Sequence, residues 1–111
     1  MEIEYQTNKL KKTARDYRAI SKQYGAMAKK VIQRLQEFKA ANSLEDIRKL
    51  PGARCHELSP KSDRLLAVDV TVNHRIIFTP RHDPMPVKED GGLDWASVTK
   101  ITIVAIGEDY H

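Results

Sequence analysis

The apolar residues change their spacing once along the chain, at Pro51-Gly52, and this change restricts the fold more than any other feature. Before it, apolar residues recur every three or four positions, which is typical of helices that bury one face. After it, they alternate or form short runs, which is typical of strands. The sequence therefore predicts an α+β protein in which helices precede most of the sheet.

Two helices are expected before the change in spacing. The first begins after a capping Thr7 or Asn8 and ends at Gly25, with Lys and Arg away from its apolar face. The apolar face of the second helix consists of Met27, Val31, Ile32, Leu35 and Phe38. These two stripes predict an antiparallel two-helix hairpin packed over a sheet, followed by a short turn capped at Ser43.

The strands fall on both sides of this hairpin. Ile3 and Tyr5 alternate with polar residues, which predicts a short N-terminal strand with one wet face. The later strands are expected at residues 54–58, 65–72, 75–78 and 101–106. The fold class is therefore a short N-terminal strand, a two-helix hairpin and then an antiparallel sheet of about four strands.

Residues 80–97 interrupt the strands with three prolines and Gly91-Gly92. This amount of turn chemistry and charge predicts a surface insertion between strands. Trp95 is the only Trp of the chain, and we expect it to anchor the insertion to the body of the protein.

The length of 111 residues fits a single domain that spans residues 1–111. No stretch approaches the roughly 20 apolar residues of a membrane span. The start lacks the basic and then apolar order of a secretory signal, and Cys55 has no second Cys to pair with. We therefore expect a cytoplasmic protein that has no contact with a membrane.

Charge is distributed unevenly between the two halves. Residues 1–54 carry a formal charge of +7, whereas residues 55–111 carry −3. A basic half of this kind fits a polyanion or an acidic protein partner. The alternative, that the Lys-rich helices only keep the protein soluble, remains open.

Several kinds of active site are excluded by spacing. The four His residues lack the separations that zinc sites use, and no glycine-rich loop stands between a strand and a helix. Cys55 alternates with Arg54 and His56 on a predicted strand, so we expect it to point inward as a small hydrophobe. The sequence therefore predicts neither a metal nor a cofactor.

Basic side chains on the strands and their loops remain as candidates. They are Arg54, His56, Lys61, Arg64, Arg75 and His111. Arg75 is followed by apolar strand residues, and a guanidinium in that position needs a counter-charge. Asp69, Glu57 or a bound phosphate would each supply one, and the sequence leaves this choice open.

Three segments carry a resemblance to a known family. They are Leu50-Pro51-Gly52-Ala53-Arg54-Cys55-His56-Glu57-Leu58, Asn73-His74-Arg75-Ile76-Ile77-Phe78 and Asp109-Tyr110-His111. In this order and spacing they resemble the HigB branch of the RelE/ParE toxin superfamily. The helical stretch from Tyr24-Gly25-Ala26 to Leu35 and the turn at Ser43 fit the same pattern, so the resemblance covers the chain from about residue 8.

This resemblance implies a RelE-like microbial RNase fold and the toxin of a type II toxin-antitoxin system. Such a toxin is a ribosome-dependent mRNA endonuclease, or mRNA interferase, that cuts in the ribosomal A site without metal and stops translation. A base removes the proton of a ribose 2′-OH, the oxygen attacks the adjoining phosphate, and cations stabilise the charge that develops.

The resemblance also implies roles for single residues. Arg75 would bind the scissile phosphate, and His111 would act as general base or acid. Tyr110 would stack on a base or orient the neighbouring nucleotide. His56 matches a His of the family's site.

The chain departs from the family at Ser59, where relatives have a Lys. Lys61 or Arg64 could take the place of this cation. If neither does, the chain could be a catalytically weak member of the fold that binds without cutting. A ParE-like toxin that inhibits DNA gyrase is a further alternative, and it would not need His111.

The partners follow from the same resemblance. They are the ribosome with its mRNA and a cognate antitoxin, which in this branch is commonly a helix-turn-helix protein of the HigA type. The complex of toxin and antitoxin would bind its operator DNA through the antitoxin.

Overall fold

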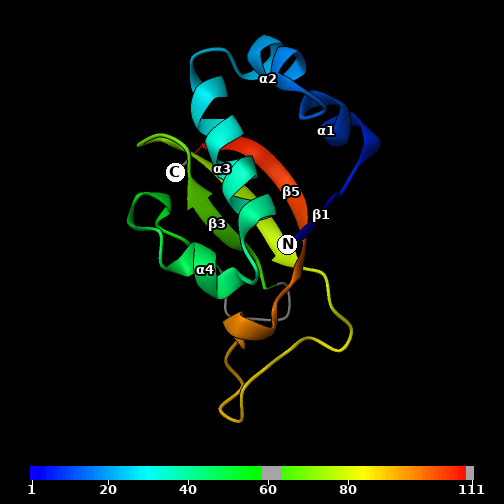
Figure 1. Cartoon of the computed structure of the whole chain (residues 1–111), viewed down its shortest axis with the longest axis vertical. Helices are drawn as coiled ribbons and strands as arrows, with labels where there is room; N and C mark the ends of the chain where they lie inside the picture. Colours follow the sequence, from blue (N-terminus) through cyan, green and yellow to red (C-terminus); the bar gives the residue numbers. More distant parts are fainter. Residues whose placement is uncertain (59–63, 110–111) are drawn as a thin grey trace.

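A five-stranded mixed sheet forms the centre of the computed structural model, which describes residues 1–58 and 64–109 (Figure 1). Its strands are β1 (Glu2–Tyr5), β2 (His56–Glu57), β3 (Leu66–Asp69), β4 (His74–Pro80) and β5 (Lys100–Asp109). The order across the sheet is β1-β5-β4-β3-β2, so β1 and β2 are the edges. The strand at the start of the chain therefore lies beside β5, far along the sequence.

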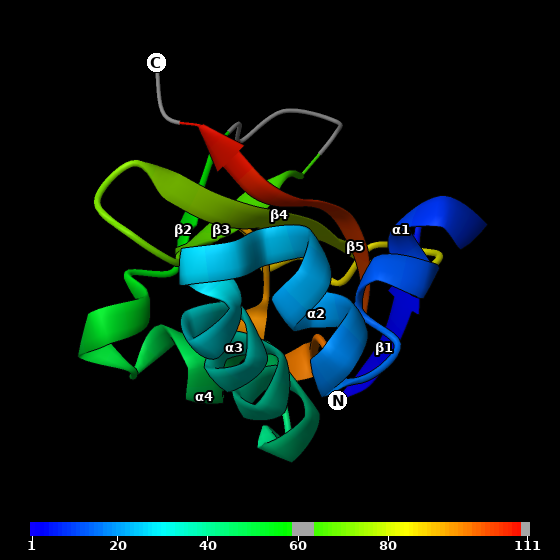
Figure 2. The ribbon, with the colours of Figure 1, turned by 90° about the horizontal axis from the view of Figure 1, so that it is seen from above.

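The helices cover one face of this sheet, as Figure 2 shows. They are α1 (Asn8–Thr13), α2 (Tyr17–Tyr24), α3 (Ala28–Ala40) and α4 (Leu44–Arg48), with short 3₁₀ helices η1 (Gly25–Met27), η2 (Pro51–Ala53) and η3 (Trp95–Ser97). No helix in the described ranges combines the length and the apolar content that crossing a bilayer requires. The opposite face of the sheet is without a helix in the described part of the chain.

The predicted α+β class and the short N-terminal strand are confirmed, but the sheet differs in one pairing. From β2 to β5, each strand is antiparallel to the next one along the chain, as expected. β1 extends this sheet as a fifth strand and runs parallel to β5, with Glu2 opposite Lys100 and Tyr5 opposite Ile103. Period-2 alternation predicts a strand but not its partner, and this partner lies almost the whole chain away.

The first predicted helix is interrupted in the structure. α1 ends at Thr13, and α2 begins again after Asp16, whose side chain accepts a hydrogen bond of 2.8 Å from the Ala19 amide. An Asp in extended conformation at this position is a strong N-cap, so it starts a new helix inside a continuous apolar pattern. Gly25 ends α2 at φ 52, as the sequence predicted.

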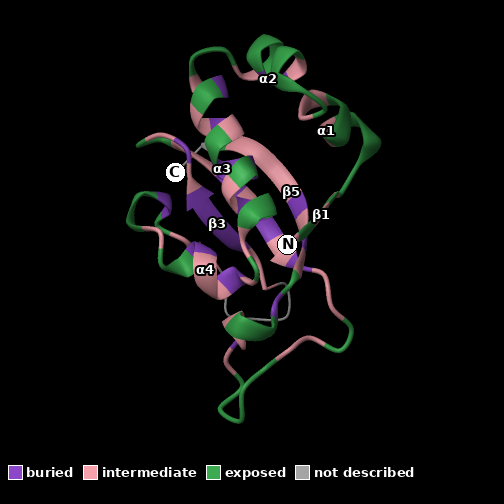
Figure 3. Cartoon of the chain, in the orientation of Figure 1, coloured by how far each residue is buried: buried purple, intermediate pink, exposed green. Residues whose placement is uncertain are grey.

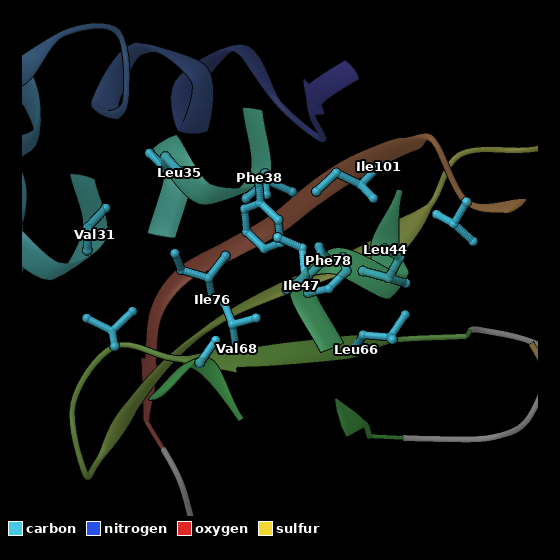
Figure 4. Close-up of a cluster of buried hydrophobic side chains, with 14 of the residues drawn as sticks. Val31, Leu35, Phe38, Leu44, Ile47, Leu66, Val68, Ile76, Phe78 and Ile101 are labelled. Atoms are coloured by element: carbon cyan, nitrogen blue, oxygen red, sulfur yellow. The ribbon is translucent and has the colours of Figure 1, made fainter. Parts of the chain in front are cut away.

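One hydrophobic core lies between the helices and the sheet, and Figure 3 shows its buried residues along α3, α4 and the central strands. Figure 4 shows part of this cluster, in which the Phe38 and Phe78 rings meet edge to face with centroids 5.0 Å apart. Its larger fully buried side chains are Val31, Phe38, Leu44, Ile47, Leu66, Val68, Ile76, Phe78, Leu93, Val98, Ile101 and Ile103. These residues hold β3, β4 and β5 firmly under α3.

The stretch 80–97 is not wholly a surface insertion, and the prediction is wrong for two of its residues, since Pro80 is a buried residue of β4. Leu93 is only 1% exposed and belongs to the core cluster. Trp95 anchors the stretch as expected, because its ring packs against the core and lies 4.9 Å from the Arg48 guanidinium. The burial of Leu93 could not be predicted from the sequence, because one apolar residue among turn residues forms no periodic pattern.

Leu93→Ala is therefore expected to lower the free energy of unfolding by at least about 2 kcal/mol, because it leaves a cavity in the core. Val87→Ala is the matched control, since Val87 is an exposed residue of the same stretch and should change stability by less than about 0.5 kcal/mol. Urea denaturation followed by circular dichroism measures both. Equal, small effects would show that the stretch can be removed without cost.

Candidate active site

Four charged residues lie in one row across the face of the sheet that the helices leave uncovered. Asp69 on β3 is paired in register with Arg75 on β4, and Arg75 with Glu108 on β5. Arg54 completes the row, since its Nη1 lies 3.4 Å from Asp69 Oδ2. Adjacent strands are about 5 Å apart, so the row alternates positive and negative groups at short intervals.

The alternation of side chains along each strand produces this row. Val68 and Ile76 point into the core, so their neighbours Asp69 and Arg75 point to the other face. On β5 the pairing shifts by one residue between Arg75 and Ile76, which leaves Gly107 as the extra residue. The bulge places Glu108 opposite Arg75.

Two features of the bulge, its backbone conformation and the space beside it, favour glycine at position 107. The φ of Gly107 is +79, which is unfavourable for residues with a Cβ. A Cβ there would also lie 3.2 Å from Met27 Cε, beneath the helices. The positive φ of Gly107 favours glycine at the bulge that sets Glu108 beside Arg75.

Arg34 of α3 supports the row from the helix side of the sheet. Its side chain is 5% exposed and donates through Nε to the Asp69 carbonyl at 2.7 Å. Nη2 donates to the Gly52 carbonyl at 2.8 Å, and Nη1 to Glu37 Oε1 at 2.9 Å. One guanidinium therefore fixes the end of β3 and the turn that leads to Arg54.

Arg54 is the most accessible member of the row, with a side chain that is 76% exposed. The sequence placed Arg54 on a strand, but it adopts a left-handed conformation at φ 45 and ψ 50, just after η2. This conformation shortens β2 to His56–Glu57 and turns Arg54 toward Asp69. Its exposed guanidinium can reach a bound anion without losing its anchor.

His56 begins β2, opposite Ala67, two residues along β3 from Asp69. Its Nδ1 lies 2.7 Å from the Arg54 carbonyl. A carbonyl oxygen only accepts, so this contact assigns the proton to Nδ1. In the neutral ring Nε2 then carries the lone pair and can act as a base.

The structure does not bring Arg64 to this end of the sheet. Its Nη1 lies 3.5 Å from Glu57 Oε1, and its Nη2 donates to the Gly91 carbonyl at 2.7 Å. Arg64 precedes Asp69 by five positions, which corresponds to about 16 Å along an extended strand. Glu57 is thus engaged by Arg64. Asp69, the other carboxylate that the sequence offered as a counter-charge, is the one in register with Arg75.

Three predicted site residues, Lys61, Tyr110 and His111, lie outside the described residues, as does Ser59. Of the predicted set, His56 and Arg75 lie on the two strands that flank β3, two residues apart in register, and Arg64 pairs with Glu57. Sequence reasoning assigned no role to Arg34, and it considered Glu108 only as a residue that could orient His111 or pair with a nearby basic group. The structure places Glu108 near the end of β5, in register with Arg75.

Cys55 behaves as the sequence predicted, as a small residue packed against the core. Burial raises the pKa of its thiol from the ordinary 9.0 to about 12, against a smaller lowering by Arg48. A thiol that stays protonated is a poor nucleophile, so Cys55 offers no covalent chemistry. Among the residues that the structure describes, no three His, Cys, Asp or Glu side chains gather as metal ligands.

The raised pKa of Cys55 predicts a loss of stability in alkali. The unfolded thiol ionises near pH 9 while the folded one keeps its proton to about pH 12, so stability is intact below pH 9 and falls above it. Between pH 8 and pH 10 the wild type should lose about 1 kcal/mol more than Cys55→Ala. Urea titrations of both proteins at the two pH values measure this, and parallel losses would contradict it.

A second charged surface lies on the helices. Between Lys9 and Lys22, α1 and α2 present six basic side chains and one acidic residue, Asp16. The basic ones are Lys9, Lys11, Lys12, Arg15, Arg18 and Lys22, and all are exposed. Six of the 13 basic residues of the N-terminal half therefore lie within this one segment.

The row presents two guanidinium groups, of Arg54 and Arg75, on either side of Asp69, and the His56 ring is hydrogen-bonded to the Arg54 backbone. A phosphodiester fits this combination, because one guanidinium group can donate two parallel hydrogen bonds to two phosphate oxygens. Neither a scan of protein-family models nor a search of curated proteins finds a match for this chain.

Proposed function

We propose that this protein is a ribosome-dependent mRNA endonuclease and the toxin of a type II toxin-antitoxin system. The observation that carries the proposal is the position of Arg54, Arg75 and His56 at one end of the uncovered sheet face. Two guanidinium groups that can bind the phosphate and an imidazole that can accept a proton suit metal-free cleavage of RNA. The resemblance of the sequence to the HigB branch supports the same reaction.

In the proposed reaction the RNA itself provides the nucleophile. An imidazole removes the proton of the ribose 2′-OH, and the oxygen attacks the adjoining phosphorus. The bond from phosphorus to the 5′ oxygen breaks, which leaves a 2′,3′-cyclic phosphate, and a second acid protonates the leaving oxygen. Arg75 and Arg54 neutralise the charge on the phosphoryl oxygens.

His56 and His111 are the two imidazoles proposed for base and acid. In the sequence His111 follows Asp109, the last residue of β5, by two positions. Asp109 is paired with His74, next to the register of Arg75 and Glu108. Tyr110 is proposed to hold the base or nucleotide that adjoins the scissile phosphate.

The part of the basic surface formed by Lys9, Arg18 and Lys22 is proposed to contact ribosomal RNA. Contacts to phosphates depend strongly on salt, because each one releases counterions. Lys9, Arg18 and Lys22 line a hollow on these helices that Ile3 and Tyr5 of β1 do not line, and they fit this role. The partner that silences the toxin is proposed to be an antitoxin of the helix-turn-helix class, which carries the complex to its operator DNA.

Primer extension on mRNA from cells that express the wild type or His111→Ala tests the proposed function. We expect breaks at fixed positions within codons for the wild type and at least a 100-fold loss of cleavage for the variant. Intact transcripts in cells that stop growing would sink the proposal. Growth arrest with DNA damage that survives His111→Ala would favour a gyrase inhibitor of the same fold.

A further inference from the structure

The outer edge of β1 is open to another strand. Of the described strands, only β5 is paired with β1, and the amides of Glu2 and Gln6 donate toward it, to the Thr99 and Ile103 carbonyls. In a parallel pair, alternate residues direct their backbone groups to opposite sides. Ile3 and Tyr5 therefore present their amides and carbonyls to the outside of the sheet.

A groove of about 600 Å³ lies beside this edge, on the helix side of the sheet. Its apolar lining comes from Ile3, Tyr5 and Ala14, and burial of the Tyr5 ring raises the pKa of its hydroxyl. Its polar lining comes from Asn8, Lys11, Lys12, Arg15 and Lys39. The groove thus combines an apolar floor with a rim of four positive charges.

The acidic residues of β1 do not neutralise this rim. Glu2 and Glu4 alternate with Ile3 and Tyr5 and so point to the opposite face. There Arg81 lies 3.2 Å from Glu2 and 3.3 Å from Glu4, and Lys100 lies 4.0 Å from Glu2. The field at the groove is therefore positive.

We propose that the edge of β1 and this groove bind an extended acidic segment of a partner protein, which adds a strand to the sheet. Main-chain hydrogen bonds to Ile3 and Tyr5 provide the docking, and acidic side chains on the helix side meet the Lys and Arg rim. This surface is separate from the row of Arg75, and the proposal does not rest on RNA cleavage.

Other occupants fit the groove less well. A second copy of this chain would bring two basic α1 helices together across the new strand pair, and like charges at close range disfavour that dimer. A nucleic acid would use the charges but not the strand edge, since its backbone cannot pair with amides in a ladder. An acidic peptide uses both the edge and the rim.

The test uses a fluorescein-labelled peptide of alternating Glu and Val, eight residues long, and fluorescence anisotropy with the whole protein. We expect the double variant Lys11→Glu with Lys39→Glu to raise Kd at least tenfold, because it reverses two charges of the rim. The matched control, Lys9→Glu with Lys22→Glu, changes the net charge equally at two residues that do not line the groove, and it should raise Kd less than threefold.

Two further probes separate strand addition from charge attraction. Two versions of the peptide are N-methylated on alternate residues, one at the odd and one at the even positions, so that each loses one set of amide donors. One of these two peptides should bind at least tenfold more weakly than the other. A twelve-nucleotide uridine RNA should not displace the parent peptide. Equal binding of both methylated peptides, equal losses for the two double variants, or displacement by the RNA would each overturn the proposal.

Discussion

Arg75→Ala is expected to reduce mRNA cleavage on translating ribosomes by about 100- to 1,000-fold, which is the usual effect of removing one group that stabilises the transition state. Arg75 lies between Asp69 and Glu108 in register. Without its guanidinium, the two carboxylates face the phosphate that the site has to bind. The variant therefore loses an attraction for the phosphate and gains a repulsion. Single-turnover cleavage of a defined mRNA on purified ribosomes measures it.

A conservative change at the same position separates charge from geometry. Arg75→Lys keeps the positive charge but not the planar pair of donors, so we expect an activity between those of the wild type and Arg75→Ala. Arg81→Ala is the matched control, because it removes an Arg just past β4, where Arg81 pairs with Glu2 and Glu4. Unchanged cleavage by a folded Arg75→Ala would exclude Arg75 from the reaction.

Arg34→Met is expected to lower the free energy of unfolding by about 3 to 5 kcal/mol. Met fills a similar volume, so the loss comes from the hydrogen bonds and not from a cavity. The carbonyls of Asp69 and Gly52 lose their charged donor, and Glu37 loses its ion pair. Denaturation in urea measures the change.

The control for Arg34 is an arginine of the neighbouring helix. Arg18→Met removes an equal charge from an exposed position and should change stability by less than about 0.5 kcal/mol. The Arg34 variant should also shift the backbone amide resonances near Gly52 and Asp69 in the folded protein. If Arg34→Met is as stable as Arg18→Met, the network contributes nothing to the fold.

Local patterns predicted much of this fold because local interactions determine those parts. Gly25 ends α2 where the sequence placed the stop, since a left-handed position favours glycine. Alternation of Ile3 and Tyr5 predicted β1. The same patterns failed at Asp16, where a single capping side chain divides a helix whose apolar spacing continues across the break.

The remaining features depend on residues that meet from distant parts of the chain. The pairing of β1 with β5, the burial of Leu93 and the three bonds of Arg34 have no local signal. The candidate site follows the same division. Alternation placed Arg75 and His56 on strands, but the row of Arg54, Asp69, Arg75 and Glu108 depends on a register that the Gly107 bulge sets.

The position of β5 between β1 and β4 also affects when this protein can acquire its structure during synthesis. β1 is made first, yet its partner in the sheet begins at Lys100. A growing chain that lacks β5 has no strand to join β1 to β4, and it lacks the buried Ile101 and Ile103 of the core. Contacts this distant in sequence slow folding, so the nascent polypeptide should remain unfolded until residues 100–109 have left the ribosome.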